Sequence, residues 1–514
     1  MKLGALRLVP APLAAPMPAQ RARVGSGELL SACRVAREAG AELVALWVTD
    51  DSDRGEGFCV RVLLRADDGL LLLEHRLPDA SSRYPDLASV FPSAARMQRA
   101  AFDLTGIAAQ ADDDRPWLWM AAWPIDRFPL RRDFAASPSW QPGDEDYRFV
   151  RVEGEGVHEI AVGPVHAGTI EPGHFRFQVV GEKVLRLEER LGFTHKGIEK
   201  RFTTLPIAEA PRLAGRICGD STVAYAFAFA QALEGLAGVA PPPRALWLRA
   251  LALERERIAN HLGDLGALGN DAGLAFGLAQ FSRLREDVLR GNRAAFGHRL
   301  AMDFVVPGGV ARDPADAQLS AMRDEGTRIA DDARALRTIY DEHAGVQDRF
   351  RTCGRVAPDL ARMLGMTGLA ARASGGTRDL RADFPGVPYA ALDVRAMHRE
   401  QGDVAARVAV RFDELFESLR LVGAIVDALP PGAIAATMPP RLPAGLALGS
   451  VEGWRGPVTF AVETGTDGAI RRCHPHDPSW QNWPAVEHAA LGNIVPDFPL
   501  INKSFNLAYS GHDL

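Results

Sequence analysis

RICGDS (residues 216–221) and DPSWQN (residues 477–482) are the two stretches that decide the fold of this chain. Each is spaced like one half of a two-part metal site of the C-x-x-C type. A soft redox metal such as nickel, or an iron centre, requires thiolate ligands. The four ligand positions hold Cys218, Ser221, Ser479 and Asn482. One thiol, two hydroxyls and an amide do not supply that ligand field, so we expect the frame of a metalloenzyme without its metal.

The residues around these stretches resemble a known family. The matching segments are GPVHAGTIEPGHFRF (163–177), HKGIEK (195–200), RIANHLGD (257–264) and VPGGV (306–310). They are similar to the large subunit of group-4, membrane-bound energy-converting [NiFe]-hydrogenases. The same family contains the quinone-pocket subunit of respiratory complex I, which carries no nickel. The resemblance covers about residues 143–514.

Departures from the family pattern indicate a particular branch. Hydrogenases have C-x-x-C and D-P-C-x-x-C, whereas the complex I subunit has a Pro-Ser-aromatic-x-Asn pattern at the second site. Ile170 falls where the complex I pocket has a quinone-contacting histidine, and residues 216–221 contain no tyrosine. The chain therefore most resembles the hydrogenase-related complexes that have lost the metal-binding cysteines, and we expect no metal in it.

The resemblance also implies three carriers for a proton or acceptor path. Glu171 precedes Gly-His as the proton-gate glutamate of the hydrogenases does, and a carboxyl beside an apolar cavity can carry protons. His166 belongs to the same segment and titrates near neutral pH. Asp271 follows His261 by ten residues, the spacing of a pocket aspartate in complex I. The competing interpretations are a helix cap or surface ion pair for Glu171, a structural histidine for His166 and a helix-end cap for Asp271.

Two cationic residues stand at further family positions. Lys196 replaces an arginine that lies near the terminal [4Fe–4S] cluster of the partner small subunit in complex I. Arg455 matches an arginine close to the lost metal. Ordinary ion pairing is the alternative role for each. We expect this chain alone to bind no cofactor, with the [4Fe–4S] cluster in the partner and a quinone as one candidate acceptor. No G-x-G-x-x-G or Walker-type loop occurs, so any NADH would bind another subunit.

Composition excludes several classes of protein. The 514 residues are 47% hydrophobic and 24% charged, which is typical of a globular protein with more than one domain. The net charge of −6 gives no reason to expect nucleic-acid binding. The five cysteines form no C-x-x-C pair, which argues for a reducing compartment and against a cluster held by this chain alone. We expect no signal peptide, and we expect a buried core helix at residues 222–240 rather than a membrane span.

The order of predicted elements gives the domain division. Residues 1–134 are expected to form a small α+β docking domain that resembles the small partner subunit of complex I, on the basis of residues 102–107 and 129–134. Strands are expected at 43–49 and 59–64, and a helix at 91–104. Residues 135–147 are the predicted linker, since serine, proline, glycine and acidic residues gather there. Residues 148–514 form the large domain.

The large domain is expected to be mainly helical with small sheets, so the fold class is α+β. Apolar residues recur every three or four positions from Leu319 to Tyr340 and from Val408 to Leu429, which predicts two long helices packed in a bundle. Short strands are expected between residues 148 and 165. A β-hairpin with a turn at Gly465–Gly468 is expected to deliver residues 477–482 to the site.

These patterns predict a subunit of a complex I-like, membrane-associated oxidoreductase. It would lie on the cytoplasmic side of the inner membrane, peripherally and without a transmembrane segment. Its partners would be an iron–sulfur small subunit and a membrane arm resembling antiporter subunits, where electron transfer drives ion movement. The alternatives are an active [NiFe]-hydrogenase large subunit, a non-catalytic coupling subunit and a monomeric soluble enzyme.

Overall fold

The computed structural model describes residues 8–25, 27–120, 123–124, 126–134, 147–168 and 170–514. It confirms the α+β class: a sheet-rich N-terminal region is followed by a mainly helical region with small sheets. Within the described residues, no helix combines the length and apolar character needed to cross a membrane. The predicted linker lies outside the described residues except for Tyr147, so the domain boundaries stay a prediction.

The N-terminal region is built on a five-stranded sheet of order β1-β2-β5-β4-β3, in which only β2 and β5 run parallel. Its strands are β1 (Ala11–Pro12), β2 (Ala19–Val24), β3 (Glu42–Asp50), β4 (Phe58–Ala66) and β5 (Gly69–Leu77). The helices α1 (Leu29–Glu38) and α2 (Ala94–Thr105) and the short pair β6 (Tyr84–Pro85) and β7 (Ala109–Gln110) complete it. The predicted helix at 91–104 begins later than expected because Phe91 and Pro92 form a turn whose carbonyls accept the N–H groups of Ala94 and Ala95.

The large region contains two three-stranded antiparallel sheets and one short strand pair. The first sheet has the order β10-β9-β8 and the second β13-β14-β15. The strands are β8 (Val157–Val162), β9 (His174–Val180), β10 (Lys183–Arg190), β11 (Val305–Val306), β12 (Gly309–Val310), β13 (Gly445–Glu452), β14 (Pro457–Thr464) and β15 (Ile470–His476). The predicted hairpin is β14–β15, and between residues 148 and 165 only β8 forms.

Four long helices form the main bundle. Their bounds are α6 (Pro243–Asp271), α7 (Ala275–Phe296), α8 (Asp316–Glu342) and α13 (Val404–Ala428). The helix α6 packs on α7 and α13, and α8 closes the ring by packing on α7 and α13. The two apolar stripes seen in the sequence are the buried faces of α8 and α13, where for example Leu336 and Leu415 are buried.

A fifth helix joins the bundle to the second sheet. This is α5 (Thr222–Ala237), which packs against β13 and β14 and is buried along most of its length, as predicted for a core helix. The remaining helices are α3 (Ile198–Phe202), α4 (Ala210–Ala214), α9 (Ala344–Phe350), α10 (Pro358–Leu364), α11 (Gly368–Arg372), α12 (Leu380–Asp383), α14 (Ser479–Ala490), α15 (Phe498–Phe505) and α16 (Ser510–Asp513).

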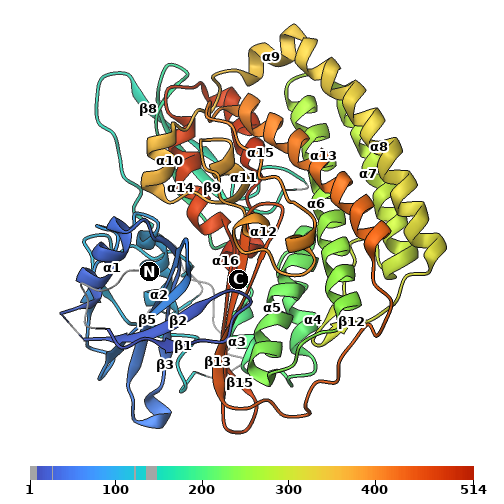
Figure 1. The fold of residues 1–514 in the computed structure, drawn as a ribbon. Helices are drawn as coiled ribbons and strands as arrows, with labels where there is room; N and C mark the ends of the chain where they lie inside the picture. The colour runs from blue at the N-terminus through green and yellow to red at the C-terminus, as the bar shows by residue number, and fades with distance from the viewer. Residues whose placement is uncertain (1–7, 26, 121–122, 125, 135–146, 169) are drawn as a thin grey trace.

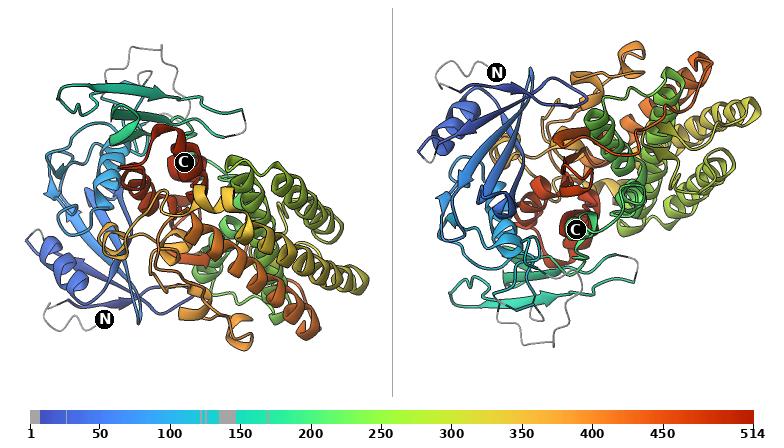
Figure 2. Two further views of the ribbon diagram at one scale, coloured as in Figure 1. Left: turned by 90° about the horizontal axis from the view of Figure 1, so that it is seen from above. Right: turned by 90° about the horizontal axis from the view of Figure 1, so that it is seen from below.

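The second sheet lies between the N-terminal sheet and the long helices (Figures 1 and 2). Contacts between β15 and β3 connect the two regions. Arg61 binds Glu463 with an Nη1–Oε2 distance of 2.7 Å, and both side chains are buried. The ring of His474 stacks on Trp47 with 5.0 Å between centroids. The N-terminal region is therefore fixed on the element that leads to residues 477–482.

The contact between β13 and α5 provides a test of the packing. A Cβ atom added at Gly449 would lie 1.7 Å from the carbonyl oxygen of Ala228, which is backbone and has little room to move. We expect Gly449→Ala to lower the free energy of unfolding by at least about 2 kcal/mol, because the strand can no longer dock on the helix. Thermal unfolding of the purified protein measures this change.

Gly423→Ala on α13 is the matched control, since no atom lies within 4 Å of the added Cβ. This change should be neutral or stabilise the protein by up to ~1 kcal/mol, because alanine has the higher helix propensity. Equal melting temperatures for the two variants would contradict the packing described for β13.

Candidate functional site

An ion pair between Arg455 and Asp220 occupies the place where the two diagnostic stretches meet. The Nη1 and Nη2 atoms of Arg455 lie 2.7 and 2.6 Å from the two carboxylate oxygens of Asp220. Arg455 also donates from Nε to the carbonyl of Asn506 at 2.5 Å and stacks on the ring of Trp454. Burial opposes the charged carboxylate, but the guanidinium prevails and lowers the pKa of Asp220 to about 2.

Cys218 faces this ion pair as a thiol. Its Sγ donates to Oδ1 of Asp220 at 3.0 Å. Burial raises the pKa of Cys218 well above its ordinary value, and the neighbouring Asp220 carboxylate raises it further. The thiolate is the form that binds metals. In this structure the cysteine is therefore held as the neutral thiol.

Internal hydrogen bonds occupy the other three positions of the degenerate site. Ser221 donates from Oγ to Asp220 at 3.0 Å and accepts the indole N–H of Trp454 at the same distance. Ser479, at the start of α14, accepts the backbone N–H of Ala508 at 2.9 Å.

Asn482 lies one turn further along α14 and exchanges two hydrogen bonds with the backbone of Thr367, at 3.0 and 3.1 Å. The residues at these C-x-x-C positions thus link neighbouring segments of the chain through hydrogen bonds. In the part of the chain that the structure describes, no group of three or more His, Cys, Asp or Glu side chains is arranged to hold a metal ion. A nickel–iron centre does not fit these residues.

A cavity of about 700 Å³ opens beside the Arg455–Asp220 pair. Glu171, Cys218 and Arg455 are predicted residues that line it, as is Ile170. The carboxylate of Glu171 accepts the N–H of Ser510 at 2.9 Å. Glu171, the predicted proton gate, and Cys218, one of the four ligand positions, therefore line the same cavity.

His166 lies one contact behind the cavity wall. Its Nε2 is 3.4 Å from the hydroxyl of Tyr509, and Tyr509 lines the cavity. Burial lowers the pKa of His166, which favours the neutral ring. Burial also raises the pKa of the Tyr509 hydroxyl, so the contact joins two neutral groups.

Asp271 and Lys196 are not part of the lining. Asp271 is an exposed residue at the end of α6, and ten helical residues place it about 15 Å along the axis from His261. The exposed Lys196 donates from Nζ to the carbonyl of Ile217 at 3.0 Å, behind Cys218. Their functional roles stay predictions.

One face of α6 supplies further residues of the site. Asn260 and Asp264 line the cavity, and Glu256 lies one turn before them against a small adjoining space that Asp220 and Asn260 also line. Both carboxyl oxygens of Glu256 accept backbone N–H groups at the start of α5, at 2.6 and 3.1 Å. The i, i+4, i+8 spacing of these polar residues was the available signal.

Buried charges beneath the cavity hold α6 to α13. Asp264 binds Nε of Arg411 at 2.9 Å and accepts from Asn506 at 2.6 Å. His261 contacts Glu414 at 3.1 Å, and Glu414 also binds Arg372 at 2.8 Å. Because these groups have lost their water, each depends on its partner, and the floor of the cavity is rigid.

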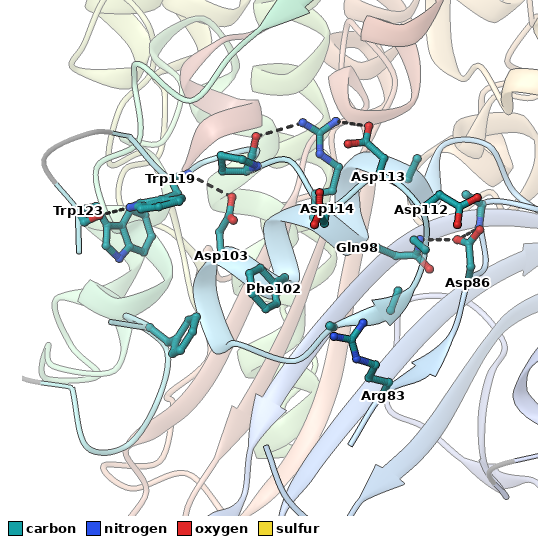
Figure 3. A pocket seen from close by; sticks show the side chains of 18 of the residues that line it. Arg83, Asp86, Gln98, Phe102, Asp103, Asp112, Asp113, Asp114, Trp119 and Trp123 are labelled. Carbon is teal, nitrogen blue, oxygen red and sulfur yellow. Dashed lines mark hydrogen bonds and ion pairs between the residues drawn. The ribbon is translucent and has the colours of Figure 1, made fainter. Parts of the chain in front are cut away.

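A second cavity, of about 540 Å³, lies in the N-terminal region. Figure 3 shows Trp119 and Trp123 at one end of it and Asp86 and Asp112 at the other. Asp103 accepts the backbone N–H groups of residues 117–119, and Asp86 accepts the amide N–H of Gln98 at 2.7 Å. These polar groups support the local fold, and none of the predicted site residues lines this cavity.

Comparisons with known proteins match the two regions of the chain to two families. Residues 271–443 match the family described as the 49 Kd subunit of the respiratory-chain NADH dehydrogenase. Residues 22–139 match the 30 Kd subunit family of the same enzyme. The first match falls in the mainly helical region, and the second falls in the sheet-rich N-terminal region.

The curated relatives extend the match over most of the chain. The chain is 31% identical to formate hydrogenlyase subunit 5 of Escherichia coli (strain K12), over 84% of this chain and 77% of that protein. It is 26% identical to the C/D subunit of the NADH-quinone oxidoreductase of Bacteroides thetaiotaomicron, over 82% of this chain and 83% of that protein.

A solved structure shares the arrangement of the large region. It is a chain of the membrane-bound sulfane sulfur reductase, an archaeal respiratory membrane complex, with a TM-score of 0.67 and 26% identity over 70% of this chain and 99% of that one. The chain therefore belongs to the family of complex I 49 Kd subunits and hydrogenase large subunits, fused to a 30 Kd-type domain, and is a subunit of an oxidoreductase complex of the respiratory membrane type.

Proposed function

We propose that this chain is the metal-free large subunit of a hydrogenase-related, complex I-like complex, of the branch that has lost the nickel-binding cysteines. The observations that support the proposal are the Arg455–Asp220 pair beside the thiol of Cys218 and the hydrogen bonds of Ser479 and Asn482 to backbone. The cavity beside that pair receives a small electron acceptor. Electrons arrive from a [4Fe–4S] cluster in a partner small subunit, and their transfer drives ion translocation in a membrane arm.

The chain's own part in this reaction is to bind the acceptor and supply protons. Glu171 holds a carboxylate at the cavity wall, and His166 is the candidate proton carrier behind it, in contact with Tyr509 at the wall. Arg455 keeps Asp220 ionised, and the two charges neutralise each other. We assign Asp271 to the outer end of the proton path and Lys196 to the side facing the partner cluster, where a cation favours cluster reduction.

The location follows from the same proposal. The chain lies peripherally on the cytoplasmic side of the inner membrane, between the iron–sulfur subunit and membrane-arm subunits of the antiporter-like kind. The net charge of −6 favours partners that are proteins rather than nucleic acid.

Two other functions would require a site with different properties. An active [NiFe]-hydrogenase requires thiolate ligands, and a single thiol with a raised pKa does not meet that requirement. A purely structural coupling subunit does not require an open cavity of this size beside ionised groups. Failure of every acceptor to reoxidise the neighbouring cluster would favour that second alternative.

Filling the cavity tests the proposed acceptor site. In the intact complex, Ala267→Trp places an indole at the lining of the cavity. We expect it to slow reoxidation of the reduced cluster by roughly tenfold or more, because the acceptor no longer approaches in a reactive position. Freeze-quench EPR measures the rate with two oxidants: a short-chain quinone, after the NADH-quinone oxidoreductase relatives, and inorganic polysulfide, after the archaeal sulfane sulfur reductase.

Ala279→Trp is the control, since Ala279 is exposed on α7 and does not line the cavity. This variant should reoxidise at the wild-type rate. Equal rates in both variants with an oxidant that the wild type uses would place the acceptor elsewhere and contradict the proposal.

A protonated Glu256 is the pH-dependent element of the site. Burial raises the pKa of Glu256 from 4.5 to about 8, so the carboxyl is neutral at pH 7. The native state then binds more protons than the unfolded state between these two values. The contribution of Glu256 to stability is present below pH 4.5 and falls by about 1.4 kcal/mol per pH unit as pH rises to about 8.

Infrared difference spectroscopy of the intact complex measures this protonation directly. We expect a carboxylic-acid carbonyl band that disappears with a midpoint near pH 8 and is missing in Glu256→Gln. Glu286→Gln should leave the band unchanged, because ion pairing with Arg299 lowers the pKa of that carboxyl to about 2. A band that persists in Glu256→Gln would refute the assignment.

A further inference from the structure

The cavity contains two cations whose charge is not neutralised by an ion pair. Four cationic side chains line it: Arg285, Arg299, Arg455 and Lys503. Arg299 binds Glu286 at 2.6 Å and Arg455 binds Asp220 at 2.6 Å. Among the residues that the structure describes, no carboxylate lies within ion-pair distance of Arg285 or Lys503. Arg299 and Arg455 therefore each have a carboxylate that neutralises their charge, whereas Arg285 has none within the described part of the chain.

Arg285 is also under-satisfied in its hydrogen bonds. It projects from α7, and its Nε is buried without a hydrogen-bond partner among the described residues. Its stem rests on α6 at Gly263, where an added Cβ would lie 3.3 Å from both Cδ and Nε. The missing side chain at Gly263 thus leaves space for Arg285 to lie along α6 at the cavity.

The carboxylates of the cavity are already bound to other groups. Asp264 is held by Arg411 and Asn506, and Glu171 accepts the N–H of Ser510. Asp220 and Glu286 are held by the two paired arginines. What the cavity offers to a ligand is positive charge, because two of its cations lack a paired carboxylate among the described residues. A partly desolvated guanidinium in this state gains most from an anion.

We propose that Arg285, assisted by Lys503, binds the anionic group of a small electron acceptor in this cavity. The proposal rests on the proposed function, and it selects an anionic, polar acceptor over a neutral quinone. A quinone carbonyl accepts a hydrogen bond but does not neutralise the cation. Charge-assisted hydrogen bonds from the planar guanidinium supply both the affinity and the orientation of an anion. Lys503 contributes less, because it is also attracted at longer range by Asp271.

Titration calorimetry of the intact complex tests this site with inorganic sulfate, a dianion that is redox-inert under these conditions. We expect saturable binding that Arg285→Gln weakens by roughly tenfold or more and Lys503→Gln weakens less. Arg285→Lys should recover part of the affinity, because it keeps the charge and loses the planar fork. Menadione, which is neutral, should bind without any dependence on Arg285.

Arg283→Gln is the matched control. Arg283 lies on the same helix, is paired with Asp332 at 2.7 Å and does not line the cavity, so its loss should leave sulfate binding unchanged. The proposal is overturned if sulfate does not bind to the wild type, or if Arg285→Gln binds it equally well. A carboxylate of another protein in the complex, seated on Arg285, would give the first of these results.

The calorimetry requires no turnover, so it is independent of the proposed function. Saturable sulfate binding in a complex whose cluster no oxidant reoxidises would leave the anion site intact and remove the acceptor function. Rapid reoxidation by a quinone with no sulfate binding would leave the acceptor function intact and remove the anion site.

Discussion

The bidentate ion pair between Arg455 and Asp220 is the interaction on which the site depends. It joins residues from opposite parts of the chain, and Cys218, Ser221, Asn506 and Trp454 are all arranged around it. The guanidinium of Arg455 is buried, so removing Asp220 would leave that charge without its partner and destabilise the site. The pair links the first stretch, through Asp220, to the turn between β13 and β14 that carries Arg455.

The surrounding structure can be understood as support for that pair. The sheet β13–β15 brings Arg455, in the β13–β14 turn, and Asp477, just after β15, to the same end, and the N-terminal sheet fixes this element through Glu463 and Arg61. On the opposite side, Asp264 and Glu414 hold α6 to α13 below the cavity. A cavity walled by ionised groups that are held by buried partners is suited to position a small polar ligand.

Local patterns in the sequence were sufficient for α8 and α13, two of the four long helices, and for the hairpin. The stripes of α8 and α13 repeat every three to four residues, and the turn at Gly465–Gly468 is encoded within a few positions. Contacts between distant residues were not accessible in this way. Asp220 meets Arg455 across 235 positions, and the segment around Arg285 has the charge pattern of an ordinary solvated helix face. Asp271 was inferred from a spacing of ten, which on a straight helix leads away from the cavity.

The central claim is that a metal-free cavity in this chain receives electrons, and metal and redox analysis of the intact complex tests it most directly. Nickel and iron are quantified in the complex purified from its native membrane, and hydrogen uptake and acceptor-dependent cluster reoxidation are measured on the same sample. Our account predicts iron without nickel, no hydrogen uptake, and a cluster that an added acceptor reoxidises. Stoichiometric nickel with hydrogen turnover would contradict it and would require ligands around Cys218 that the arrangement described above does not provide.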